Sequence, residues 1–243
     1  MRIIKLNAIG STNTFLRQIS SAEPLDDYTV VVAQHQTNGR GQMGTEWQVQ
    51  EGKNLTFSVL KKTKFVSTDD HFFISIATSL AVHSAMIRLK IPKVQIKWPN
   101  DILAENQKIC GILIENVLKN NRTIASIIGI GLNVNQIDFS GLPNATSVLK
   151  LTGRNYSTEE IMHAILDDLK INFNRLKEGD LEGIKKDYES KLFRRNKPST
   201  FKDQGNAMFS GYIQGVSRNG NLQVLLEDDI VKEYDLKEIE LLY

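Results

Sequence analysis

The chain has 243 residues, of which 41% are hydrophobic and 24% charged, and thirty basic residues nearly balance twenty-eight acidic ones. This composition is ordinary for a folded globular protein, so it excludes the collagen-like, coiled-coil and disordered classes. A net charge of +2 gives no electrostatic reason to expect a nucleic-acid partner. The single cysteine, Cys110, can form neither an internal disulfide nor a structural zinc site.

Targeting and membrane signals are not recognisable in the sequence. The N-terminal residues lack a long apolar stretch followed by a small-residue cleavage pattern. The longest apolar-rich run, Phe72 to Ile87, is broken by polar residues and is shorter than the roughly 20 residues that a membrane helix needs. These features predict a cytoplasmic protein without a membrane segment.

The N-terminal part alternates strand and helix patterns, read from β-branched runs, helical periodicity and caps. In chain order these are a strand at Arg2–Ala8, a helix after the N-cap Ser11, strands at Thr29–Gln34 and Leu55–Leu60, a helix over Asp69–Leu89, strands at Val94–Lys97, Lys108–Leu118 and Thr123–Asn133, and a helix that begins with a capping box at Ser157.

The tail shows a strand pattern of its own, at Met208–Val216, Leu222–Leu226 and Ile230–Leu236. Asn219-Gly220 between the first two strands is typical of a type I′ hairpin turn. Residues 199–243 carry four basic and eight acidic groups, which leaves a balance of +6 for residues 1–198. A basic body suits an anionic small ligand, although a solvated mixture of charges explains it equally well. We place a domain boundary between residues 197 and 198.

The segment NGRGQMGTEW (38–47) holds three glycines within six residues. A glycine-rich loop lets backbone N–H groups approach an anion closely. Arg40, between two of the glycines, could pair with a carboxylate or phosphate, and Trp47 could stack on a purine. The spacing matches neither a P-loop nor a Rossmann fingerprint, and a plain surface loop explains the glycines equally well.

Three more segments concentrate polar groups or glycines beside strands. KWPND (97–101) groups a cation, an amide and a carboxylate after a strand, although it is also good turn chemistry. KICG (108–111) opens an apolar strand with a lysine, which is costly to bury without an anion. GIGLNVN (129–135) places glycines inside a strand pattern, where close approach of a ligand and a β-bulge are competing explanations.

In this order, GRGQMGTEW, KWPND, KICGIL and GIGLNVN resemble the signature of biotin protein ligases, also called biotin–[acetyl-CoA-carboxylase] ligases. The early Ser11-Thr12-Asn13, the strand-end Gln34 and the β-rich tail fit the same pattern. The resemblance implies an α+β fold, in which a mixed sheet with helices, like that of class II aminoacyl-tRNA synthetases, forms a catalytic domain over residues 1–197. A small SH3-like β-barrel would follow over residues 198–243.

Enzymes of this family use MgATP to convert biotin to biotinyl-5′-AMP, and then transfer the biotinyl group to a lysine of a carboxylase carrier domain. The resemblance therefore implies biotin, ATP and Mg²⁺, with the metal brought by the triphosphate and no metal ligand assigned in the protein. The implied partner is a biotin carboxyl carrier domain, with no nucleic acid and no membrane. Some relatives dimerise through the catalytic sheet, so a homodimer is compatible with the resemblance.

The resemblance also assigns candidate site residues. Lys108, Arg40 and Asp101 would be catalytic: the Lys108 ammonium would bridge the carboxylate and the α-phosphate, Arg40 would hold the carboxylate, and Asp101 would orient the acceptor lysine or accept its proton. The biotin-binding residues would be Ser11, Thr12, Asn13, Gln34, Gly39, Arg40, Gly41, Gln42, Lys108, Gly111 and Leu113. The ATP-binding residues would be Trp47, Lys97, Asn100 and Asn133.

Two departures from the family pattern stand out. Gln42 and Thr45 occupy positions where the family loop often carries further arginines, so mainly backbone contacts to the adenylate are expected there. The sequence begins at the first catalytic strand, so the DNA-binding domain of larger members is not expected. Two alternatives stay open. One is a lipoate–protein ligase, whose longer arginine- and glycine-rich signature this sequence lacks, and the other is a non-catalytic biotin-binding module, which would not need Lys108.

Overall fold

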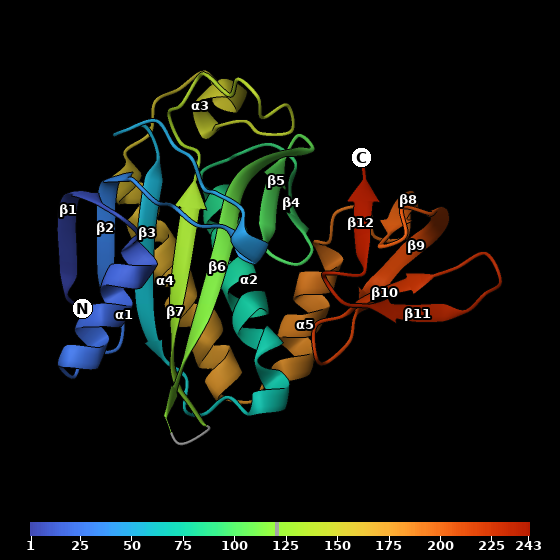
Figure 1. Ribbon diagram of the computed structural model, residues 1–243, viewed down its shortest axis with the longest axis horizontal. Helices are drawn as coiled ribbons and strands as arrows, with labels where there is room; N and C mark the ends of the chain where they lie inside the picture. The colour runs from blue at the N-terminus through green and yellow to red at the C-terminus, as the bar shows by residue number, and fades with distance from the viewer. Residues whose placement is uncertain (120–121) are drawn as a thin grey trace.

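A seven-stranded mixed sheet forms the N-terminal part of the protein (Figure 1). The computed structural model describes residues 1–119 and 122–243. The strand order is β1-β2-β3-β7-β6-β5-β4, in which β1 and β2 run parallel and the other neighbours antiparallel. The strands are β1 (Ile3–Ile9), β2 (Thr29–Gln36), β3 (Leu55–Lys62), β4 (Val94–Lys97), β5 (Asp101–Ala104), β6 (Gln107–Lys119) and β7 (Arg122–Leu132).

Helices cover both faces of this sheet (Figure 1). On one face α1 (Thr12–Ala22) packs against β2, β3 and β7 around a small apolar cluster. On the other face α2 (Phe72–Arg88) lies between the sheet and the helices α4 (Thr158–Lys177) and α5 (Leu181–Ser190). Because α2 lies between the sheet and two helices, most of its residues are buried. These residues, the sheet and the two helices form the main hydrophobic core. A short helix, α3 (Val148–Thr152), lies in the connection that follows β7.

A second, five-stranded antiparallel sheet follows α5 (Figure 1). Its order is β11-β10-β9-β8-β12, and its strands are β8 (Pro198–Asp203), β9 (Met208–Val216), β10 (Leu222–Leu225), β11 (Val231–Tyr234) and β12 (Ile239–Leu242). The hairpin predicted around Asn219-Gly220 joins β9 and β10, but only Gly220 has a positive φ, of 96°. The predicted type I′ turn is therefore wrong, because that turn needs a positive φ at both central residues.

Most strands and helices of the N-terminal part agree with the sequence patterns. The helix predicted after Ser11 begins at Thr12, and Ser11 caps it by accepting from the Thr14 N–H. Ser157 caps α4 in the same way through the Glu160 N–H. Among the described strands and α-helices, five were not predicted: β5, α3, α5, β8 and β12. The antiparallel C-terminal sheet agrees with a small β-rich domain, while its SH3-like barrel character and the boundary at residue 198 stay predictions.

In the described part of the chain, no helix combines the length and the apolar character that crossing a bilayer requires.

Candidate active site

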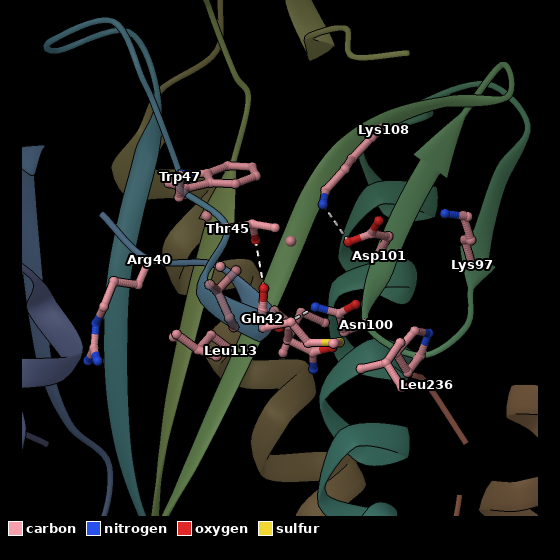
Figure 2. Close-up of a pocket in the computed structure, with 18 of the residues that line it drawn as sticks. Arg40, Gln42, Thr45, Trp47, Lys97, Asn100, Asp101, Lys108, Leu113 and Leu236 are labelled. Atoms are coloured by element: carbon pink, nitrogen blue, oxygen red, sulfur yellow. Dashed lines mark hydrogen bonds and ion pairs between the residues drawn. The ribbon is translucent and has the colours of Figure 1, made fainter. Parts of the chain in front are cut away.

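A cavity of about 510 Å³ opens beside the edge of the large sheet that carries β5 and β6 (Figure 2). Many parts of the chain meet there, among them the start of α1, the loop over residues 40–47, the KWPND segment, the strands β6 and β7, and the C-terminal part. The glycine and KWPND motifs, distant in sequence, therefore line one space.

The floor of the cavity is formed by backbone where β6 and β7 carry glycine. The Trp47 indole lies directly on Gly111 and Gly131: a Cβ added at Gly111 would lie 3.2 Å from the ring, and one at Gly131 would lie 2.5 Å from its Nε1. A Cβ at Gly129 would lie 2.5 Å from Asn13 Oδ1. These glycines are needed because side chains from other elements lie flat against the two strands.

The glycine-rich loop is a short closed turn. Gly41 N–H donates to the Thr45 carbonyl at 2.6 Å, and Trp47 N–H donates to the Gly39 carbonyl at 3.0 Å. At its tip, Met43 and Gly44 both have positive φ, of 54° and 78°. Gly39 is buried under Trp47 and does not line the cavity.

Two buried polar atoms of this loop have no hydrogen-bond partner in the described part of the chain. They are Trp47 Nε1 and Gln42 Oε1, and both residues line the cavity. An unsatisfied buried donor or acceptor is costly, so these atoms mark positions where a ligand could supply the missing partner.

The N-terminus of α1 supplies a network of polar groups. Thr12 donates from its backbone N–H and its hydroxyl to Gln36 Oε1, at 2.7 and 3.0 Å. Ser58 Oγ lies 2.7 Å from Thr12 Oγ1 and 2.6 Å from Asn13 Oδ1. Ser11, Thr12 and Asn13 are all buried and line the cavity, so they are placed to contact a polar group within it.

Gln34, which was expected to contact biotin, does not line the cavity. Its side chain is exposed, whereas Gln36, two residues later, lines the cavity and binds Thr12. The reason is the length of β2: the strand continues to Gln36, which pairs with Ile9 directly before the start of α1. The strand-end glutamine is therefore Gln36.

Lys108 and Asp101 face one another across the β5–β6 pair (Figure 2). Lys108 Nζ lies 2.6 Å from Asp101 Oδ1, an ion pair without hydrogen-bond alignment, and 5.8 Å from the centre of the Trp47 ring system. Both side chains line the cavity, with 33% and 15% of their surfaces exposed. The two charged groups could therefore act on a ligand that approaches over Trp47.

Lys97 lies on the side of the cavity that faces the C-terminal sheet. Its Nζ lies 5.0 Å from the centre of the Tyr243 ring. Burial lowers the pKa of Lys97, the Asp101 carboxylate raises it, and the Lys108 ammonium again lowers it. A buried cation of this kind is stabilised by an added anion.

Asn100 and Asn133, assigned to ATP, differ in their places. Asn100 lines the cavity, and its Nδ2 donates to the Ile112 carbonyl at 2.8 Å. Asn133 does not line the cavity. It is only 4% exposed, and its backbone binds Ile109 and Val148. Asn133 directly follows β7 and is buried, and its contact with ATP stays a prediction.

Arg40 lies at the cavity margin with its guanidinium directed away from Lys108 (Figure 2). Its Nη2 donates to Thr14 Oγ1 at 3.1 Å and to Glu115 Oε1 at 3.3 Å. Gln36, Ser58 and Glu115, which complete these networks, were not recognised in the sequence. Their partners are 24 to 102 residues away along the chain.

Gly41, Gln42 and Leu113, the other assigned biotin contacts, all line the cavity. Residues of β12 and of the segment before it complete the wall, among them Leu236, Ile239 and Leu241. Trp98, in the KWPND segment, donates from Nε1 to the Gly220 carbonyl at 2.8 Å and so connects the two parts of the wall.

Comparison with known proteins identifies the family. The model of the biotin/lipoate A/B protein ligase family matches residues 6–133, which is more than half of the chain. The chain belongs to the biotin/lipoate A/B protein ligase family. This membership confirms the resemblance drawn from the sequence motifs.

Curated relatives within this ligase family include two bacterial proteins. The biotin–[acetyl-CoA-carboxylase] ligase of Mycobacterium tuberculosis is 34% identical over 148 residues, which cover 58% of this chain and 53% of that protein. The bifunctional ligase/repressor BirA of Bacillus spizizenii is 33% identical over 134 residues, covering 55% of this chain and 41% of that protein. The chain thus spans about half the length of the relatives that it matches.

A solved structure is similar over nearly the whole chain. It is a biotin protein ligase from Aquifex aeolicus in complex with biotin and ATP, with a TM-score of 0.83 and 28% identity, covering 99% of this chain and 98% of that one. This similarity confirms the predicted mixed sheet with helices.

Proposed function

We propose that this protein is a biotin–[acetyl-CoA-carboxylase] ligase, which activates biotin with ATP to biotinyl-5′-AMP and transfers the biotinyl group to a lysine of a carrier domain. The observation that carries the proposal is the cavity in which the Lys108–Asp101 pair faces a glycine floor covered by Trp47. Similarity to an Aquifex aeolicus enzyme solved with biotin and ATP supports it.

Biotin has a polar ureido group at one end, an apolar bicycle and a carboxylate at the other end. The network of Ser11, Thr12 and Asn13 offers hydrogen bonds suited to the ureido group, and Gly111 with Leu113 forms an apolar surface beside it. In this orientation the carboxylate would reach toward Lys108.

Lys108 would carry the central charge in the first step. Adenylation needs the biotin carboxylate to attack the α-phosphate of ATP while pyrophosphate leaves, so negative charge meets negative charge. An ammonium placed between the two groups lowers this repulsion in the transition state. Lys108 needs to form no covalent bond, and the ion pair with Asp101 fixes where its Nζ lies.

The nucleotide would occupy the part of the cavity between Trp47, Lys97 and Asn100. Trp47 would stack on the adenine, and the buried Lys97 would offset phosphate charge. The described residues include no cluster of three or more metal-ligand side chains. Mg²⁺ suits this site only as an ion held mainly by the triphosphate, where it would screen phosphate charge.

In the second step the carrier lysine must lose a proton and attack the biotinyl carbonyl of the mixed anhydride, whose bond to the phosphate breaks so that AMP leaves. Asp101 is the carboxylate at the centre of the site, paired with Lys108, and could orient that amine or accept its proton. The carrier domain, a homodimer, the absence of a nucleic-acid partner and a cytoplasmic location are parts of the same proposal.

The decisive experiment incubates the full chain with α-labelled ATP and either biotin or lipoate, with and without a biotin carboxyl carrier domain. With biotin but not with lipoate, we expect a labelled adenylate and a carrier that gains a biotinyl group. The biotinylated carrier is detected by its mass, because the α-phosphate label leaves with AMP. If an adenylate forms only with lipoate, the substrate is lipoate and not biotin. Binding of biotin without any adenylate would show a non-catalytic biotin-binding module.

A further inference from the structure

Glu115 binds two parts of the site at once, although neither the motifs nor the proposed chemistry gives it a role. Its Oε2 accepts a hydrogen bond from Asn13 Nδ2 at 2.9 Å, and its Oε1 accepts one from Arg40 Nη2 at 3.3 Å. The side chain is 21% exposed, so both bonds are partly shielded from water. Charge-assisted bonds in such a setting are stronger than neutral ones.

Glu115 continues a row of residues that begins inside the cavity. On β6, residues two apart share a face, so Gly111, Leu113 and Glu115 point the same way. The first two line the cavity, and Glu115 lies one step beyond its end. A carboxylate at this place reaches both α1 and the glycine-rich loop.

On the cavity side, the carboxylate orients an amide. The Leu113 carbonyl and the Glu115 carboxylate only accept hydrogen bonds, so the Asn13 atom that faces them is Nδ2, and Oδ1 is left to accept from Ser58 at 2.6 Å. Asn13 also lies directly on Gly129. Its orientation therefore depends on contacts from β3, β6 and β7, of which only Glu115 is charged.

On the loop side, the carboxylate holds Arg40. The Arg40 guanidinium binds Glu115 and Thr14, and its backbone forms a bridge with Glu46 that closes the loop. Gly41 and Gln42 follow directly and line the cavity. The hydrogen-bonded ion pair between Glu115 and Arg40 therefore positions the loop over the site.

We propose that Glu115 is a positioning residue that couples Asn13 to Arg40, so that a ligand bound beside Asn13 and closure of the loop stabilise one another. This inference rests on the proposed function for the identity of the ligand, biotin. The ion pair between Glu115 and Arg40 does not depend on which ligand binds.

The test uses Arg40 itself as the reporter. Arg40-Gly41 is the one trypsin site between Arg17 and Lys53, and cleavage there requires the loop to open. We expect Glu115→Gln to speed cleavage after Arg40 about tenfold without ligand, because a neutral amide of the same shape holds the guanidinium less well. An unchanged rate would overturn the proposal.

The matched control is Arg17→Ala. Arg17 Nη2 lies 3.8 Å from the same Glu115 oxygen but belongs to α1, so its loss should change cleavage after Arg40 less than twofold. If Arg17→Ala speeds cleavage after Arg40 as much as Glu115→Gln does, the charge balance around Glu115, and not its ion pair with Arg40, controls opening of the loop. If Glu115→Gln does not fold, Glu115→Asp, too short to reach both partners, replaces it.

The second arm measures the coupling. Saturating biotin should slow cleavage after Arg40 several-fold in the wild type and leave the Glu115→Gln rate unchanged, although calorimetry shows biotin bound to both. Equal protection in both proteins would refute the coupling. If the wild type binds no biotin, the proposed function is refuted. The cleavage rates of the wild type and Glu115→Gln without ligand would still test the ion pair between Glu115 and Arg40.

Discussion

At the scale of single residues, Lys108 and Gly131 show how the site depends on charge and on the absence of a side chain. Lys108 Nζ pairs with Asp101 at 2.6 Å near the Trp47 ring. Gly131 lets that ring lie against β7. One residue supplies a charge to the cavity, and the other supplies space.

Replacing Lys108 with alanine should lower the rate of adenylate formation about 100-fold, since preorganised electrostatic groups are worth this much in mutagenesis. The thermal midpoint should change little, because the side chain is one-third exposed. A steady-state assay of adenylate formation measures the effect. The control is Lys93→Ala, a lysine that is 74% exposed and does not line the cavity. Turnover near the wild-type rate in Lys108→Ala would remove Lys108 from the mechanism.

Gly131→Ala should raise the KM for ATP about tenfold, because the new methyl group displaces the Trp47 ring and stacking of this kind is worth ~1–3 kcal/mol. Trp47→Ala should have a similar effect, measured by the dependence of adenylate formation on ATP. Gly10→Ala is the matched control, since a Cβ there meets no atom within 4 Å. Equal KM values for Gly131→Ala and the wild type would show that Trp47 does not contact the nucleotide.

At the scale of elements, the residue at which a strand begins or ends determines which polar side chains contact one another. β2 ends at Gln36, two residues later than its apolar pattern indicated, and this brings Gln36 instead of Gln34 to the start of α1. The KWPND segment is the entry to a strand, β5, and not only a turn, so Asp101 pairs with Gly111 on β6. Small changes at the ends of elements therefore decide which polar residues meet.

Helix α2 carries His83 into the core and should make stability depend on pH. His83 is 7% exposed, and burial, assisted by Lys191, lowers its pKa from 6.5 to about 4. Between these values the unfolded state binds more protons than the folded state, so stability is intact above pH 6.5 and falls as the pH drops toward 4. The loss at pH 5 should be about 2 kcal/mol.

Urea unfolding at pH 7 and pH 5 measures this loss, and His83→Gln should remove most of it. The comparison uses the difference between the two pH values within each protein, so a general destabilisation by the substitution cancels. The same pH-dependent loss in both proteins would assign it to other groups.

At the scale of the whole molecule, the C-terminal sheet docks on the N-terminal part and supplies one wall of the cavity. Arg218 binds Asp70 through two hydrogen bonds, of 2.6 and 3.0 Å, and these bonds hold the pKa of Asp70 below its usual value. Beside this pair, Gly220 lies against the Phe72 ring and accepts from Trp98. The hairpin between β9 and β10 is thus held to the N-terminal end of α2.

Arg218→Ala should loosen this docking and raise the KM for ATP about fivefold, because bidentate arginine–carboxylate pairs fix geometry as well as charge. Biotin binding, at the far end of the cavity, should change less. Lys232→Ala is the control, because it removes a cation on β11 whose Nζ lies 4.8 Å from the centre of the Tyr234 ring on the same strand. An unchanged KM for ATP in Arg218→Ala would show that the C-terminal sheet does not shape the nucleotide site.

Local patterns in the sequence predicted most strands and helices of the N-terminal part and the residues of several site motifs. Period-two and helical patterns identified most elements of the sheet and the helix caps, because these features depend on residues close along the chain. Four glycine- and lysine-bearing motifs in a fixed order identified the family, and most of their residues line one cavity. Short, weakly apolar elements such as β5 and α5 escaped detection because tertiary contacts stabilise them.

Only the tertiary structure decided which of these residues contact one another. It brought Gln36 to Thr12, Ser58 and Glu115 to Asn13, and Glu115 to Arg40, from segments far apart in the chain. It also placed Asn133 in the interior and the C-terminal sheet on the wall of the cavity. Composition and motifs determine which chemical groups are present and near which strand ends, whereas sheet order, strand length and domain docking determine their distances, because those arise from packing between distant segments.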